Sequence, residues 1–308
     1  MEKTYELMPN AKMLLSSLRS VGYTEETAIA DIVDNSISSG ANTIQLYFDW
    51  DDQTILIADN GKGMQKRELL DSMKIGSSDP GVTRSASDLG RFGMGMKTAS
   101  FSLGKQLLVI TKQKDEINNA EWNLEYVENE DKWEILIHSD EKIDTYIKSK
   151  TDKIEFQNWD EGTLISLSML DKLIDENNMQ KSKVKFYKTV EKVKKHLAMI
   201  FHRFIEEDNL QIYVNKNLLE AWNPFIRQNP ATMELACEEL FDGKTIVSIE
   251  PYILPHKTKF EDEEAFKKAG GAKDWLAHQG FYVYRNRRLI VYGTLENSKR
   301  NQHIIWHV

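Results

Sequence analysis

The sequence predicts an α/β sandwich domain followed by a second α/β domain, and three observations carry this prediction. Apolar residues recur at helical spacing over residues 28–37, which predicts a helix, and Thr24, which precedes them, can cap it. Residues 44–50 alternate apolar and polar positions, and an acidic turn leads to a continuous apolar run at 54–58, which is typical of a β-hairpin. A helical stretch is expected at 96–103, and further strands are expected at 105–111, 121–127, 132–138, 163–170, 210–214 and 244–253. The polar and charged segment 141–160 is expected to be a connection without regular structure. Because the helices stand before and between the strands, the layout favours a sandwich over a Rossmann unit.

The first polar block lies on the helix predicted after Thr24. Asp31 and Asn35 are i,i+4 neighbours on the flank of the apolar stripe, and Gly40 supplies the helix stop. A carboxylate and an amide one turn apart suit Mg²⁺, which prefers oxygen ligands, and the carboxylate can take a proton from an attacking water. The alternative is an ordinary polar helix face with a local hydrogen bond.

The second block, Asp59-Asn-Gly61-Lys-Gly63-Met64, begins where the hairpin's second strand ends. Gly61 and Gly63 allow positive φ and close approach of a ligand to the backbone. A carboxylate at this strand end can accept a hydrogen bond from an exocyclic amine such as that of adenine. The alternative is a simple Asp-Asn-Gly turn.

The third block places Gly90, Gly93 and Gly95 directly before the helical stretch, with Lys97 in its first turn. Free backbone N–H groups at a helix start and a nearby ammonium form a phosphate site, and a glycine-rich loop can close over a ligand as a lid. A P-loop is rejected, because a P-loop follows a strand and the preceding residues 83–88 are polar.

The three blocks in this order resemble the GHKL ATPases, which include gyrase B, the ninety-kilodalton heat-shock chaperone, histidine kinases and MutL. The nearest resemblance is to the MORC- and MutL-like bacterial members. It covers residues 24–104, extends to Gly162-Thr163 and returns at 281–292. It implies a Bergerat-type α/β sandwich, ATP and Mg²⁺ as cofactors, and ATP hydrolysis.

The resemblance also implies roles for individual residues. Asp31 matches the general base, although the family usually has the longer glutamate, and Asn35 matches the Mg²⁺ ligand. Asp59 would take the adenine amino group, and Thr163 would reach adenine through water, unless it is a strand threonine without a ligand. Lys97 is expected at the phosphates and in catalysis. The other expected nucleotide contacts are Gly61, Gly63, Met64, Gly76, Gly90, Gly93, Met94, Gly95 and Met96, of which Met64 is alternatively a core filler.

The domain prediction places the ATP-binding domain at 1–170, with an N-terminal arm at 1–10 and a lid at about 76–96. Residues 171–308 are expected to form a ribosomal-S5-like transducer domain, because the hairpin around 285–288 resembles that of MORC and MutL proteins. The abrupt end at Val308 suggests a truncated transducer and a longer protein. Candidates for the cation that reaches the γ-phosphate are Arg288, Lys299 and Arg300.

The leading functional hypothesis is a slow ATPase whose lid closure and dimerisation switch a DNA-handling machine, such as one used in restriction or antiviral defence. The alternatives are a nucleotide-gated binding module with little or no hydrolysis, and a chaperone-like or kinase-like GHKL protein. A lysine-rich helix at 181–204 is the candidate DNA contact, against the alternative of a solvated face.

Composition limits the remaining classes. The 308 residues carry a net charge of −8, which argues against wholesale coating of nucleic acid but leaves room for a local basic patch. The single cysteine, Cys237, excludes an internal disulfide and a cysteine-based zinc site. No apolar run approaches the ~20 residues of a membrane helix, and no signal peptide is recognised, so a cytoplasmic protein is expected.

Overall fold

The computed structural model describes residues 5, 10–20, 22–76, 95–241, 243, 246–271, 275, 278 and 280–293. The chain divides into two compact units. Unit 1 comprises Met1–Lys194 and Leu210–Leu219, and unit 2 comprises Lys195–Asn209 and Glu220–Val308. The expected boundary at residue 170 and the S5-like assignment of the second domain stay predictions.

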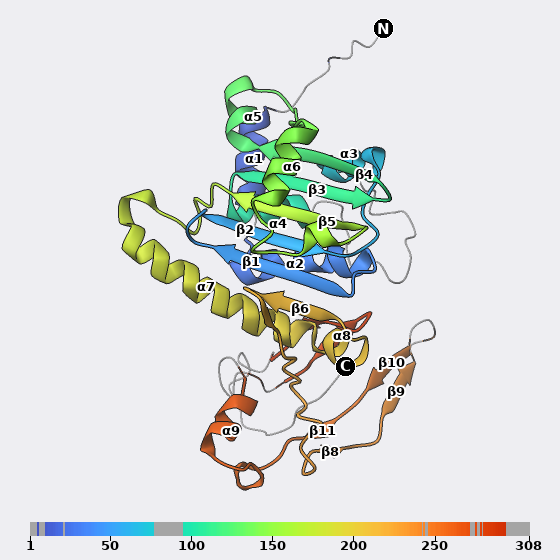
Figure 1. Cartoon of the computed structure of the whole chain (residues 1–308). Coiled ribbons are helices and arrows are strands. Elements are labelled where there is room, and N and C mark those ends of the chain that lie inside the picture. Colours follow the sequence, from blue (N-terminus) through green and yellow to red (C-terminus); the bar gives the residue numbers. More distant parts are fainter. Residues whose placement is uncertain are drawn as a thin grey trace. The chain divides into compact units, whose positions relative to one another are not determined.

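Unit 1 is built on a seven-stranded sheet with the order β4-β3-β5-β2-β1-β6-β7 (Figure 1). The strands are β1 (Thr43–Asp49), β2 (Thr54–Asp59), β3 (Gln106–Gln113), β4 (Glu116–Asn123), β5 (Gly162–Ser168), β6 (Gln211–Val214) and β7 (Asn217–Leu218). Every neighbouring pair is antiparallel except β1–β6, which is parallel. The mixed α/β architecture with a mostly antiparallel central sheet is therefore as the sequence predicted.

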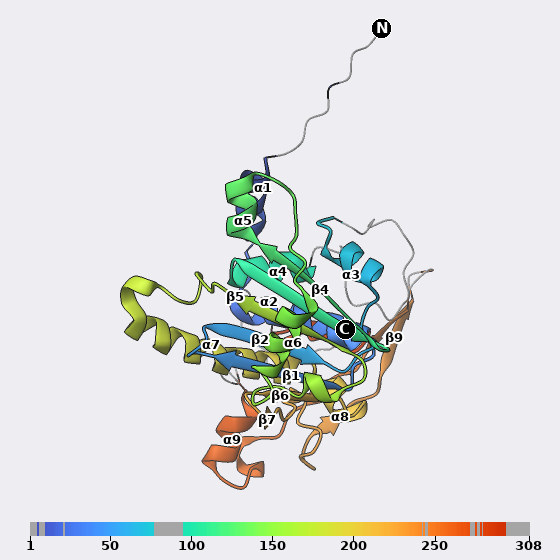
Figure 2. The same ribbon diagram turned by 45° about the horizontal axis from the view of Figure 1, so that its top comes forward.

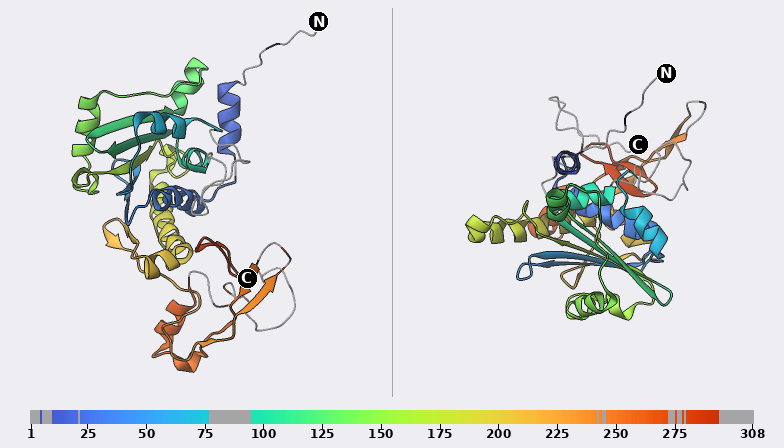
Figure 3. Two further views of the ribbon diagram at one scale, coloured as in Figure 1. Left: turned by 90° about the vertical axis from the view of Figure 1, so that its right-hand side faces the viewer. Right: turned by 90° about the horizontal axis from the view of Figure 1, so that it is seen from above.

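Helices cover both faces of this sheet. They are α1 (Ala11–Arg19), α2 (Glu25–Ser38), α3 (Lys66–Met73), α4 (Gly95–Leu103), α5 (Leu124–Glu130) and α6 (Asp140–Lys148), with the short η1 (Phe156–Asn158) and η2 (Glu176–Asn178) and the long α7 (Met179–Ile200). On one face α2 packs against α4, and α1 contacts both α4 and α5 (Figure 2). The opposite face carries α6 (Figure 3, right), which buries Ile143 and Ile147 against Leu56 and Leu108 of the sheet.

The elements that hold the three polar blocks form for the expected reasons. Thr24 caps α2 and takes part in a capping box with Thr27, and Gly40 follows the helix with a φ of +81°. In the hairpin, Asp59 pairs with Ile44 and Thr54 with Asp49, so the register matches the predicted alternation. The helix expected at 96–103 is α4, and the hairpin expected at 281–292 is also present.

Three expectations between residues 121 and 160 are wrong. Strand β4 ends at Asn123, whose side chain accepts hydrogen bonds from the next backbone N–H groups and starts α5 where a strand was expected. Residues 132–138 contribute one isolated bridge, Glu121 to Leu136, in place of a strand. The segment expected as a loop contains α6, because Ile143 and Ile147 lie one turn apart and face the sheet.

Unit 2 contains short elements around an aromatic core. They are α8 (His202–Glu207), β8 (Met233–Glu234), β9 (Glu238–Phe241), β10 (Ile246–Ile249), β11 (Tyr252–Ile253), η3 (Lys257–Lys259), α9 (Glu263–Ala269), β12 (Val283–Arg285) and β13 (Arg288–Val291). The described strands pair as three two-stranded sheets, β10-β9, β11-β8 and β12-β13. Phe225 stacks on Tyr252 with ring centroids 4.7 Å apart and meets Tyr282 edge-on. The strand expected at 244–253 is divided, since β10 and β11 belong to different sheets.

Among the helices that the structure describes, none is long and apolar enough to cross a membrane.

Candidate nucleotide site

Three polar side chains from three adjacent strands meet on the face of the sheet that carries α2 and α4. Asp59 at the end of β2 pairs with Thr163 of β5, and Thr163 pairs in turn with Thr111 of β3. The hydroxyls of Thr111 and Thr163 lie 3.3 Å apart, and Thr111 Oγ1 also donates to the Gly162 carbonyl at 3.1 Å. The strand order β2-β5-β3 therefore builds a polar cluster at one end of the sheet from residues about fifty positions apart in sequence.

The Asp59 carboxylate is 4% exposed and is held at both oxygens. Ser36 of α2 donates to Oδ2 at 2.8 Å, and the backbone N–H of Gly61 donates to Oδ1 at 3.0 Å. Burial raises the pKa of Asp59, while the hydrogen bonds from Ser36, Gly61, Thr163 and Ser39 oppose that rise. The donors orient a buried acceptor whose remaining lone pairs can receive a further hydrogen bond.

The glycines after Asp59 are required by close contacts. A Cβ at Gly61 would lie 1.8 Å from Ser39 Oγ, and one at Gly63, whose φ is +62°, would lie 2.0 Å from the Lys112 carbonyl oxygen. Only glycine avoids these clashes. The next residue, half-buried Met64, donates its backbone N–H to Thr111 Oγ1 at 2.8 Å. The turn is thereby drawn against β3, and the backbone of the second block lies beside the polar cluster.

The first block places its two polar residues on one side of α2. The Tyr23 hydroxyl donates to Asp31 Oδ2 at 2.7 Å, and Asn35 Nδ2 donates to the Asp31 backbone carbonyl at 2.9 Å. The Asn35 amide oxygen, which is the atom that Mg²⁺ would take, accepts no hydrogen bond from the residues that the structure describes. A Cβ at Gly95 would lie 3.9 Å from Asp31 Oδ2, so the start of α4 approaches the carboxylate.

Lys97, in the first turn of α4, is a buried cation. Its side chain is 3% exposed, and Nζ donates to the Ser72 carbonyl of α3 at 2.7 Å. Burial lowers the pKa of Lys97 to about 8, and no carboxylate of the described residues offsets that effect. An ammonium buried against a neutral carbonyl favours the arrival of an anion, so the residues present fit a bound phosphate.

Comparison with known proteins finds a family model that matches part of the chain. Residues 23–160 match the family model described as "Histidine kinase-, DNA gyrase B-, and HSP90-like ATPase". The matched segment contains Asp31, Asn35, Asp59 and Lys97 in the arrangement described above. Residues 23–160 therefore resemble the GHKL ATPases, and we call this segment the GHKL domain.

Relatives of the GHKL domain carry MORC names. The chain is 33% identical over 121 residues to "ATPase morc-1" of Caenorhabditis elegans, which is 38% of this chain and 14% of that protein. It is 28% identical over 109 residues to "MORC family CW-type zinc finger protein 3" of Mus musculus, covering 33% of this chain and 11% of that protein. With human "ATPase MORC2" the identity is 25% over 119 residues, 36% of this chain and 11% of the other. The chain thus spans about one seventh or less of the length of these relatives.

The structure brings together Asp59, Gly61, Gly63, Met64 and Thr163 of the expected GHKL site, and separately places Asp31 and Asn35 beside the start of α4. Gly95, Met96 and Lys97 form that first turn. Gly76 is exposed, with a φ of +75°. Gly90, Gly93 and Met94, most of the expected lid, and the candidate cations Lys299 and Arg300 lie outside the described residues. Arg288 lies in β13 of unit 2, with its guanidinium 5.7 Å from the Phe201 ring centre.

Three residues of the GHKL site were missed from the sequence. Thr111 ends a predicted strand, but its role depends on the register of β3 against β5. Ser36 lies one position after Asn35, and only the packing of α2 on the sheet shows that its hydroxyl reaches Asp59. Tyr23 precedes the Thr24 cap, and the cap fixes the direction from which the chain enters α2. Over the described ranges, no cluster of three or more His, Cys, Asp or Glu could hold a metal by protein ligands alone.

Proposed function

We propose that the GHKL domain binds ATP with Mg²⁺ on the α2/α4 face of the sheet. The observation that carries this proposal is the cluster of Asp59, Thr111 and Thr163 beneath the Gly61–Gly63 turn. Asp59 would accept a hydrogen bond from the adenine amino group, which a guanine oxo group cannot donate. Thr163 would reach the base directly or through a water. Calorimetric titration with a non-hydrolysable ATP analogue and Mg²⁺ tests this, and no binding at millimolar nucleotide would contradict it.

The phosphates would lie at the start of α4. Lys97 supplies an ammonium that pairs with no carboxylate in the part of the chain that the structure describes, and the N–H groups of a helix's first turn attract anions. Mg²⁺ would be held by the Asn35 amide oxygen together with phosphate oxygens and waters, and would neutralise charge on the transferred phosphoryl group. The glycines before α4 would form the lid.

Hydrolysis is proposed to use Asp31 as the general base. The attacking water would give its proton to the Asp31 carboxylate as its oxygen bonds to the γ-phosphorus and the bond to the β-phosphate oxygen breaks. The Tyr23 hydroxyl at 2.7 Å from Oδ2 holds the carboxylate in one orientation. Tyr23 is therefore a positioning residue, and it restrains a side chain that is one methylene shorter than the glutamate usual in the family.

The second candidate function is nucleotide-gated binding without turnover, which the shorter Asp31 favours. A single-turnover assay separates the two, since protein in excess over labelled ATP releases phosphate only if it hydrolyses. Wild-type release that disappears in Asp31→Asn supports the ATPase. Tight binding with no release supports the gated module.

We further propose that ATP binding drives homodimerisation and that the module acts on DNA. The DNA proposal concerns α7, whose lysines are partly engaged: Lys185 donates to the Lys172 carbonyl, Lys194 pairs with Glu191, and Lys183 lies over the Trp50 ring. Light scattering with and without the ATP analogue tests dimerisation. A gel mobility-shift assay tests DNA contact. We expect binding that weakens steeply with salt and that is lost when the exposed Lys181 and Lys188 are replaced by glutamine.

A further inference from the structure

A cavity with polar and apolar walls lies in unit 1 on the face of the sheet opposite Asp59. Its volume is about 160 Å³, and β2, β3, β5 and α6 supply most of its walls. Side chains alternate between the two faces of a strand, so Thr54 and Leu56 face α6 whereas Asp59 faces α2. The cavity is distinct from the nucleotide site, and nothing proposed for the nucleotide site depends on it.

A chain of hydrogen bonds borders the cavity. Ser168 Oγ donates to Gln106 Oε1 at 2.5 Å, and Gln106 Nε2 donates to Glu121 Oε1 at 2.7 Å. His138 Nε2 lies 2.7 Å from Glu121 Oε2, and Lys142 Nζ lies 3.0 Å from His138 Nδ1. An ammonium can only donate, so Nδ1 accepts and Nε2 carries the proton given to Glu121. Both oxygens of the buried Glu121 are therefore already in use.

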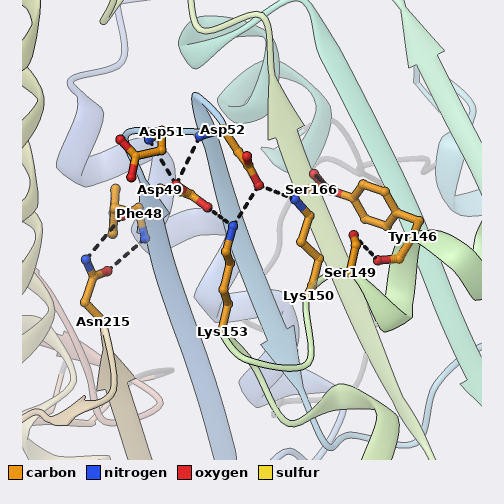
Figure 4. A network of polar contacts seen from close by, with 10 residues as sticks. All are labelled: Phe48, Asp49, Asp51, Asp52, Tyr146, Ser149, Lys150, Lys153, Ser166 and Asn215. Carbon is orange, nitrogen blue, oxygen red and sulfur yellow. Dashed lines mark hydrogen bonds and ion pairs between the residues drawn. The ribbon is translucent and has the colours of Figure 1, made fainter.

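Other groups that line the cavity have hydrogens left to donate. Thr54 is 8% exposed, and its Oγ1 has no hydrogen-bond partner among the described residues. The Tyr146 and Ser166 hydroxyls, drawn in Figure 4, share one hydrogen bond of 2.6 Å, so one of their two protons remains. The Lys142 ammonium has two further N–H groups. Among the described residues the buried Thr54 hydroxyl thus lacks an acceptor, which is costly for a buried hydroxyl.

We propose that this cavity binds a short-chain organic acid. The ligand's carboxylate would pair with Lys142, which is exposed at the mouth, and an oxygen on its chain would accept from Thr54 inside. Leu108 and Ile143 provide apolar walls for the carbons between the two ends. The volume is below the roughly 300 Å³ at which drug-sized pockets begin, so a ligand of a few carbons fits.

The test is a titration of the labelled full chain followed by NMR, with three probes of similar size. L-lactate has the carboxylate and a chain hydroxyl, propionate lacks the hydroxyl, and propane-1,2-diol lacks the carboxylate. We expect lactate to move the His138 ring and Thr54 methyl signals with the highest affinity. Lys142→Met should lower the affinity for lactate by about tenfold or more, because a charge-assisted hydrogen bond is lost. Lys148 is an exposed lysine of the same helix, and Lys148→Met should leave the affinity unchanged.

Thr54→Val, which replaces the hydroxyl by a methyl of similar size, should abolish the preference for lactate over propionate. Asp59→Asn should leave lactate binding unchanged, so a failure of the nucleotide proposal does not affect this one. The proposal would be overturned if the diol bound as tightly as lactate, or if the two lysine variants had equal effects. It would also be overturned if no NMR signal shifted at tens of millimolar probe. So would a lactate-soaked crystal whose cavity holds only water. If Thr54→Val fails to fold, the wild-type ratio of lactate to propionate affinity decides the same point.

Discussion

Two aspartates of one hairpin, Asp59 at the end of β2 and Asp52 in the turn before it, show opposite electrostatic behaviour. Asp59 is buried among neutral donors, and burial raises its pKa. Asp52 is nearly half exposed and meets two ammonium groups, those of Lys150 and Lys153, each at 2.7 Å (Figure 4). Hydrogen bonds from Lys150 and Lys153 lower the pKa of Asp52 to about 2.

The difference indicates that the Asp52 turn stabilises the fold, whereas the Asp59 face is suited to ligand recognition. Lys153 also contacts Asp49, whose Oδ1 accepts from the backbone N–H groups of Asp51 and Asp52, so the charges around the turn satisfy one another. These contacts join the β1–β2 turn to the segment after α6. On the opposite face Asp59 and Lys97 are buried, and neither pairs with an opposite charge among the described residues. Such an arrangement lowers stability unless a ligand uses it. Substitutions on the nucleotide face should therefore change nucleotide handling, and substitutions at the turn should change stability alone.

The largest expected effect is that of Asp31→Asn. The amide keeps the shape and can still accept from Tyr23, but it cannot take a proton, so turnover should fall by about 10²–10⁴-fold with nucleotide affinity nearly unchanged. Steady-state phosphate release and calorimetry measure the two quantities. Unchanged turnover would remove Asp31 from the base role.

Tyr23→Phe isolates the positioning contact. With only the hydroxyl removed, turnover should fall by about tenfold, because the hydrogen bond that holds the Asp31 carboxylate in one orientation is lost. A loss of turnover in Asp31→Asn without any change in Tyr23→Phe would mean that the tyrosine merely packs there.

Local signals explain why much of the nucleotide face could be predicted from the sequence. The Thr24 cap, the apolar stripe of α2 and the β1–β2 alternation are each encoded within a few neighbouring residues. These signals place Asp31, Asn35 and Asp59 on the correct elements. Thr111 could not be assigned, because it meets Thr163 only through the strand order β2-β5-β3, which local periodicity does not specify.

The α6 face was harder to predict for a physical reason. Only Ile143 and Ile147 of α6 are buried, and charged residues surround them, so the segment resembles a polar loop until the sheet supplies a surface to cover. Asn123 similarly changes a strand into a helix through its side-chain cap. In both places long-range packing or a single cap outweighs average propensity.

Another prediction concerns Lys97→Met, a neutral replacement of similar length. Loss of a charge-assisted contact to phosphate should weaken ATP binding by about 10- to 100-fold at pH 7, whereas Lys66→Met on exposed α3 should not. Calorimetry measures both variants. Equal affinities in wild type and Lys97→Met would take this lysine out of the phosphate site.

The pH dependence of binding sharpens the same prediction. The pKa of Lys97 is lowered to about 8 in the free protein, and a bound phosphate would raise it by favouring the charged form. Binding above pH 8 must then take up a proton, so affinity should be flat near pH 7 and fall as the pH rises through 8. Lys97→Met should lose this dependence, and a wild-type affinity that stays constant to pH 9 would contradict it.

A smaller effect is expected for Asp59→Asn. Replacing the acceptor oxygen that meets the adenine amino group should lower ATP affinity by about tenfold and reduce the preference for ATP over GTP. Because burial raises the pKa of Asp59, the charged form is disfavoured in the folded protein, so the neutral amide should leave the melting temperature unchanged or higher. A lower melting temperature with an unchanged preference for ATP over GTP would mean that Asp59 stabilises the fold and does not recognise adenine.

The smallest effect is expected at the turn, for Asp52→Asn. The pKa of Asp52 lies at about 2, below its ordinary 3.8, so its charge stabilises the fold above pH 4, and that contribution disappears as the pH falls through 2. Solvent screening of a half-exposed pair keeps the loss at pH 7 below about 1 kcal/mol. Denaturant unfolding at pH 7 and at pH 2 should show a small destabilisation of the variant at the higher pH and a smaller one at the lower, where Asp52 is partly protonated. ATP affinity should not change, because the turn and the Asp59 cluster lie at opposite ends of β2, and a change in affinity would show that the two aspartates are coupled.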